Sequence, residues 1–71
     1  MAAYPYDSLT FVAKNVEGEN LSWSISNPSL AEIVFQEGDT AVVRITTYKG
    51  NKEGFDIIYG ELSKHIIINS L

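Results

Sequence analysis

The sequence has no cysteine, a single histidine and only two prolines among its 71 residues. The lack of cysteine excludes disulfide bonds, thiol catalysis and the usual cysteine-based zinc clusters. Packing and hydrogen bonds must therefore supply the stability of the folded chain. The redox state of its compartment stays open, because cysteine-free domains occur both inside and outside cells.

Basic residues are also scarce, with five Lys and Arg against nine Asp and Glu, which gives a net charge of -4. The few cations are scattered, which argues against a surface that tracks nucleic-acid phosphates. No apolar run approaches the ~20 residues that a bilayer requires, and residues 1–8 lack the features of a signal peptide. We therefore expect no nucleic-acid partner and no membrane insertion.

Catalytic groups are few. His65 is the only histidine, so a triad or a histidine metal site would need partners that the sequence does not place beside it. The glycines form no phosphate-binding motif, and the carboxylates have no calcium-loop spacing. We predict no enzyme activity, no catalytic residue, no metal site and no cofactor. His65 is expected on the outer face of the last strand.

What the chain does have is apolar content, 45% of its residues, arranged with a period of two. Such alternation is typical of strands with one face in the core. It predicts strands over residues 9–14, 21–26, 31–36, 41–46, 55–59 and 65–69. Polar, glycine- or proline-containing turns separate them at 15–20, 27–29, 37–39, 48–54 and 60–63. We expect almost no helix and a single all-β domain over residues 1–71, a sandwich or a small barrel.

One face of these strands should form the core. Trp23 lies between Leu21 and Ile25 at two-residue spacing, so a buried position is favoured over a ligand platform. The predicted core consists of Leu9, Phe11, Leu21, Trp23, Ile25, Ile33, Phe35, Val43, Ile45, Phe55, Ile57, Tyr59, Ile66 and Ile68.

The segment LSWSISNPSLAEI at residues 21–33 resembles the hallmark of bacterial immunoglobulin-like domains of group 2, which read approximately W-S-x-S-[DN]-P-x-[IV]-A-x-[IV]. Residues 38–43, 54–58 and 63–68 resemble that family's later strands, so the likeness covers residues 9–69. It implies an immunoglobulin-like sandwich of six to seven short antiparallel strands. The chain departs from the family at its start, where residues 1–8 leave room only for a short extension or a stub strand, which Tyr4-Pro5-Tyr6 would supply.

The resemblance also implies a function. Such domains are non-enzymatic structural or adhesive modules of bacterial cell-surface proteins and of phage virion proteins. It implies an extracellular, cell-surface or virion location within a larger protein, and partners such as neighbouring domains, capsid, tail or host proteins, or cell-surface carbohydrate. The alternative is a stand-alone small protein that binds and modulates a host protein. A phage-encoded protein is one form of this alternative.

Two surfaces are candidates for such contacts. Ile58 and Ile67 are predicted to point outward from neighbouring strands, although scattered exposed isoleucines are also normal in proteins without partners. The short start of the chain should leave the edge of strand 9–14 unpaired, which invites strand addition or pairing between copies. Tyr4 and Tyr6 are predicted either to join this surface or to cover the edge.

Overall fold

The computed structural model describes residues 1–16, 18 and 20–71 of the chain. They form seven strands: β1 (Ala2–Ala3), β2 (Ser8–Val12), β3 (Trp23–Ile25), β4 (Ala31–Glu37), β5 (Thr40–Ile45), β6 (Asn51–Tyr59) and β7 (Leu62–Ile68). All six predicted strands are present, and the described residues contain no helix. The predicted turn 15–20 includes Glu17 and Glu19, which lie outside the described residues.

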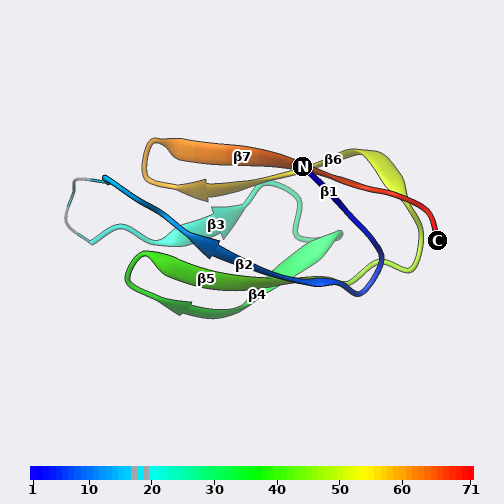
Figure 1. Cartoon of the computed structure of the whole chain (residues 1–71), viewed down its shortest axis with the longest axis horizontal. Helices are drawn as coiled ribbons and strands as arrows, with labels where there is room; N and C mark the ends of the chain where they lie inside the picture. Colours follow the sequence, from blue (N-terminus) through cyan, green and yellow to red (C-terminus); the bar gives the residue numbers. More distant parts are fainter. Residues whose placement is uncertain (17, 19) are drawn as a thin grey trace.

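The strands form two sheets that pack face to face (Figure 1). One sheet has the order β1-β7-β6-β3 and the other β2-β5-β4. In immunoglobulin domains the second, fifth and fourth strands share one sheet, and the third, sixth and seventh share the other. The protein is therefore an all-β, immunoglobulin-like sandwich, as the sequence predicts.

The first strand is the unusual one. β1 pairs in parallel with β7, with Ala2 opposite Ile67 and Ala3 opposite Ile68, whereas all other pairs are antiparallel. Tyr4-Pro5-Tyr6 does not form the stub strand. It belongs to a turn closed by hydrogen bonds between Tyr4 and Asp7, which carries the chain from one sheet to the other.

The core lies between the sheets, and its largest fully buried side chains are Phe55, Ile45, Ile66, Ile68 and Val43. Trp23, Ile57 and Tyr59 are also buried, as predicted. The predicted residues Leu9, Phe11, Leu21, Ile25 and Ile33 are partly buried and pack against this cluster. Leu30 and four alanines complete the core, and the predicted core set omitted them: Ala3, Ala13, Ala31 and Ala41.

Phe35 was wrongly predicted to point inward, since it is 50% exposed. A bulge in β4 is the cause. Ile33 pairs with the buried Val43 but Phe35 pairs with Val42, so β4 has one residue more than β5 over this stretch. The extra residue reverses the alternation beyond it and turns Phe35 to the outer face.

A second irregularity corrects the predicted loop 48–54, because β6 already begins at Asn51. Asn51 pairs with Ile68 and Phe55 with Ile66, so β6 holds two extra residues here. The side-chain oxygen of Asn51 accepts the backbone N–H groups of Glu53 at 3.0 Å and Gly54 at 2.9 Å. These bonds stabilise the bulge within the strand.

Candidate functional site

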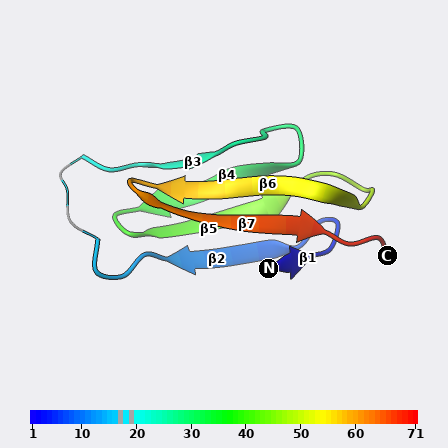
Figure 2. The ribbon, with the colours of Figure 1, turned by 90° about the horizontal axis from the view of Figure 1, so that it is seen from above.

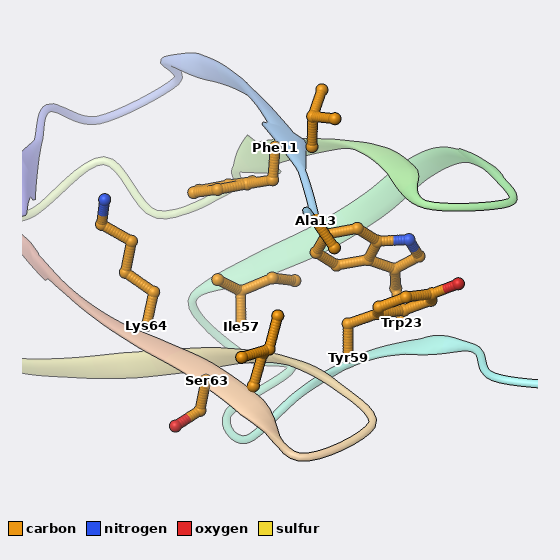
Figure 3. Close-up of a pocket in the computed structure, with 9 residues that line it drawn as sticks. Phe11, Ala13, Trp23, Ile57, Tyr59, Ser63 and Lys64 are labelled. Carbon is orange, nitrogen blue, oxygen red and sulfur yellow. The ribbon is translucent and has the colours of Figure 1, made fainter. Parts of the chain in front are cut away.

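The two sheets are not closed equally on all sides, and the open side contains a groove. β1 covers only the end of β7, around Ile67 and Ile68, and leaves the start of that strand without a neighbour on its outer side. In Figure 2, β1 lies beside the C-terminal end of β7, and β2 extends past β1 toward the start of β7. Between the end of β2 and the start of β7 lies a groove of about 230 Å³ (Figure 3).

The floor of the groove is apolar and firmly held. The rings of Trp23 and Tyr59 stack with their centres 4.6 Å apart and their planes 26° from parallel. The indole Nε1–H of Trp23 donates to the carbonyl of Gly38 at 3.2 Å, and its backbone N–H donates to Oε1 of Gln36 at 3.2 Å. Ile57 completes this floor. The indole is thus tied to the opposite sheet and serves as structural core, as predicted, while one part of it borders the groove.

The walls come from the two strands whose edges face each other. Residues 11–13, at the end of β2, form one wall, and residues 62–64, at the start of β7, form the other. Alternate residues of a strand project to the same face, so Leu62 and Lys64 share the inward face of the buried Ile66 and Ile68. Nothing covers them in the described structure, and Leu62 remains 47% exposed. Figure 3 shows Lys64 extending toward β2, while Ser63 points the other way.

Both walls offer free backbone groups. In β2 the N–H of Ala13 and the carbonyl of Asp7 bond toward β5, so the odd-numbered residues face that strand. By alternation, the N–H and C=O groups of Ser8, Thr10 and Val12 face outward. In β7 the N–H of Ile67 bonds to Met1 on the β1 side, which places the backbone groups of Ser63 at the uncovered part of that edge. Such unpaired edges are templates for another strand.

The predicted surface residues do not gather at one place. Ile58 is opposite Ser63 in the β6–β7 ladder, whereas Ile67 lies at the other end of β7, beside Ala2. Both isoleucines are half-buried. Tyr4 and Tyr6 are 46% and 52% exposed in the turn before β2, and Tyr6 packs against Arg44, whose guanidinium carbon is 5.9 Å from the ring centre. These four residues therefore form no single patch.

A polar pair separates the two isoleucines. Nδ1 of His65 lies 2.8 Å from Oδ1 of Asp56 across the β6–β7 ladder, and both side chains are largely exposed. His65 thus faces outward, as predicted. A carboxylate that orients an imidazole is part of hydrolytic triads, but no hydroxyl group in the described residues is hydrogen-bonded to this ring. The geometry is that of a surface cross-strand pair.

The part of the chain that the structure describes offers neither a metal site nor a membrane-spanning helix. It contains no group of three or more His, Asp or Glu side chains placed to hold a metal ion. Nor does it contain a helix long and apolar enough to cross a bilayer. The groove is the most apolar of the hollows in this part of the chain, since the neighbouring hollows beside Asn15 and Val16 are more polar.

Comparisons of the chain with family models, with curated proteins and with solved structures give no match. Two features bear on function: the sequence pattern around Trp23 and the geometry of the open side.

The sequence predicted the free edge of strand 9–14 but missed the groove. A signal was present, because extending the alternation of Ile66 and Ile68 backward places Lys64 and Leu62 on the inward face.

Proposed function

We propose that this protein is a non-enzymatic, immunoglobulin-like module of the bacterial group 2 type, which makes protein contacts through its open side. It would act as a structural or adhesive unit of a bacterial surface protein or a phage virion protein. The observation that carries this proposal is the groove itself, an apolar hollow between two strand edges with free backbone groups. Edges of this kind bind extended segments of other chains by strand addition.

The segment that resembles the family has a structural task consistent with the proposal. Trp23 anchors the core, and the following residues carry the chain from β3 in one sheet to β4 in the other. The side-chain oxygen of Asn27 accepts from the backbone N–H of Ser29 at 3.1 Å and from its hydroxyl at 2.6 Å. Leu30 then enters the core, with only 8% of its surface exposed. Asn27 and Leu30 thus support the crossing between the sheets.

The apolar character of the interior also supports a module rather than an enzyme. Among the described residues, no polar or charged side chain is buried, and His65 stands on the outer face with Asp56 as its partner. Enzymes commonly hold catalytic groups in a cleft where burial and neighbouring charges shift their pKa values. The groove is lined by apolar side chains together with Ser63 and Lys64. Its composition favours contact with apolar side chains of a partner.

A capture experiment with a matched pair of variants tests the proposal. Immobilised protein is exposed to purified cell-envelope and virion fractions, and the bound proteins are compared for wild type, Leu62→Lys and Val34→Lys. Leu62 borders the groove and is 47% exposed, whereas Val34 lies on β4 and is 52% exposed. We expect Leu62→Lys to lose a partner that wild type and Val34→Lys both retain. Equal binding by all three proteins would count against the groove as the contact site.

The alternative, a stand-alone protein that modulates a host protein, would use the same groove. It differs in the gene rather than in the fold. A reading frame that continues beyond the codon of Met1 or Leu71 favours the module, and a host-protein partner captured from lysate through the groove, with no such continuation, favours the alternative. Sequencing the locus separates the two.

A further inference from the structure

Four strands lie at sheet edges, and three of them carry features that discourage pairing with another chain. β3 is only three residues long. β4 is interrupted by its bulge and carries the charges of Glu32 and Glu37. β1 is a two-residue stub, and the part of β7 that it leaves open bears the inward-facing Lys64. Short length, bulges and inward charges are the devices that protect edges from unwanted pairing.

β2 has none of these features. Its sequence, SLTFV, contains no charge and no proline, and all five residues pair with β5 in a regular register. Thr10 and Val12 are exposed on its outer face. This is a straight, uncharged edge with a β-branched surface, the kind of edge that accepts another strand.

The free groups of β2 are also complementary to themselves. Ser8, Thr10 and Val12 present their N–H and C=O groups outward, as derived above from the bonds of Asp7 and Ala13. In an antiparallel pair with a two-fold axis at Thr10, Thr10 faces Thr10 of the second copy and Ser8 faces Val12. Every one of these donors and acceptors then finds a partner.

We propose that two copies of this protein associate through antiparallel pairing of their β2 strands, which joins the two β2-β5-β4 sheets into one continuous sheet. This proposal rests on the proposed function, because it names a second copy as the partner of the open side. The pairing also brings the second copy alongside the groove that Phe11 and Val12 border.

The pairing is weak because the contact is small. A five-residue strand and its flanking groove form a contact at the small end of protein interfaces, where association is transient. We expect a dissociation constant between about 1 µM and about 1 mM. Neighbouring copies on one surface or within one chain would be concentrated enough to pair.

Sedimentation velocity from about 10 µM to about 1 mM protein, the range set by that affinity, tests the proposal. Wild type should shift from monomer to dimer. Thr10→Lys places two ammonium groups opposite each other at the two-fold axis, and should weaken the dimer at least about tenfold. Val34→Lys adds the same charge to the outer edge of β4 and should leave the dimer intact. Circular dichroism checks that both variants remain folded.

A mixing experiment makes the test specific. Thr10→Glu alone should also be monomeric, but an equimolar mixture of Thr10→Lys and Thr10→Glu should form a heterodimer, since opposite charges now face each other across the pair. In hydrogen exchange, the amides of Ser8, Thr10 and Val12 should gain protection as wild-type concentration rises, while the amide of Ser63 should not.

Three results would overturn the proposal: wild type that stays monomeric, equal weakening by Thr10→Lys and Val34→Lys, or a mixture that stays monomeric. Failure of the proposed function has a different signature. A monomeric wild type that still loses a captured partner on Leu62→Lys removes the second copy as the occupant, but retains the open side as a contact site.

Discussion

At the scale of single residues, Trp23 joins the two sheets. Its ring stacks on Tyr59 of its own sheet, and its indole N–H reaches the carbonyl of Gly38 at the turn between β4 and β5. Trp23 therefore packs within its own sheet and donates a hydrogen bond to the opposite one. Typical domains have a free energy of unfolding of about 5–15 kcal/mol, and a domain this small lies at the low end. The loss of one such residue can therefore unfold it.

Replacing Trp23 with alanine should cost about 3–5 kcal/mol, the usual effect of truncating a buried aromatic side chain. We expect thermal melts followed by circular dichroism to show little cooperative unfolding in Trp23→Ala. Tyr48→Ala is the matched control, since Tyr48 is 68% exposed. A Trp23→Ala protein that melts cooperatively within a few degrees of wild type would contradict the role of the indole.

Gly54 is the second residue whose identity the structure requires. Its φ angle is +65°, and an added Cβ would lie 1.9 Å from the carbonyl oxygen of Ile66. Gly38 has a similar φ of +56° but open space around it. The two glycines thus separate the cost of backbone conformation from the cost of a clash.

Gly38→Ala should lower the free energy of unfolding by about 1 kcal/mol, the conformational cost alone. Gly54→Ala should lower it clearly more, because the backbone of β7 must also move away. Urea denaturation of the two variants measures the difference in unfolding free energy. Equal losses would show that the bulge in β6 yields without cost to the new methyl group.

At the scale of elements, the sequence was a good guide to strands and a poor guide to their irregularities. The alternation around Trp23 and around Val43 predicted β3 and β5, because one face of each strand is buried and the other is not. The two bulges could not be predicted, since an extra residue is visible only when a strand is aligned with its partner. Phe35 was misplaced for this reason, and residues 51–54 were taken for a loop.

The same reasoning applies to the candidate site. The free edge of β2 followed from the short N-terminal segment and could be predicted. The groove depends on where β1 pairs along β7, and two alanines carry no pattern that reveals this position. Leu62 was assigned to the turn 60–63, and the predicted strand began only at residue 65, after Lys64, so the inward orientation of both side chains was missed.

The stub strand β1 should contribute more than its length suggests. Ala3 is only 1% exposed, and the β1 segment accepts hydrogen bonds from the N–H groups of Ile67 and Asn69. Removing residues 1–3 should lower the unfolding free energy by at least about 1 kcal/mol, since these bonds are lost. Hydrogen exchange should show faster exchange at Ile67 and Asn69 and unchanged exchange at Val43. Unchanged exchange at all three amides would mean that β1 does not hold the edge of β7.

At the scale of the whole molecule, the net charge of -4 opposes any meeting of two copies. The proposed contact itself is uncharged over residues 8–12. Long-range repulsion should therefore act on association without strong attraction between charges at the contact to offset it.

Raising the salt concentration should strengthen self-association, because screening shortens the reach of repulsion from about 10 Å at 0.1 M to about 3 Å at 1 M. Sedimentation at both concentrations measures the effect, and Val34→Lys, which reduces the negative charge, should show a smaller one. Association that weakens with salt would instead indicate that attraction between oppositely charged side chains dominates the contact.

Trp23 is also an intrinsic fluorescent probe of the groove. The chain has only this one indole, and part of it borders the groove. Emission from an indole shifts in wavelength as neighbouring water is displaced, so filling of the groove would be read out directly as a blue shift, with no label attached to the molecule.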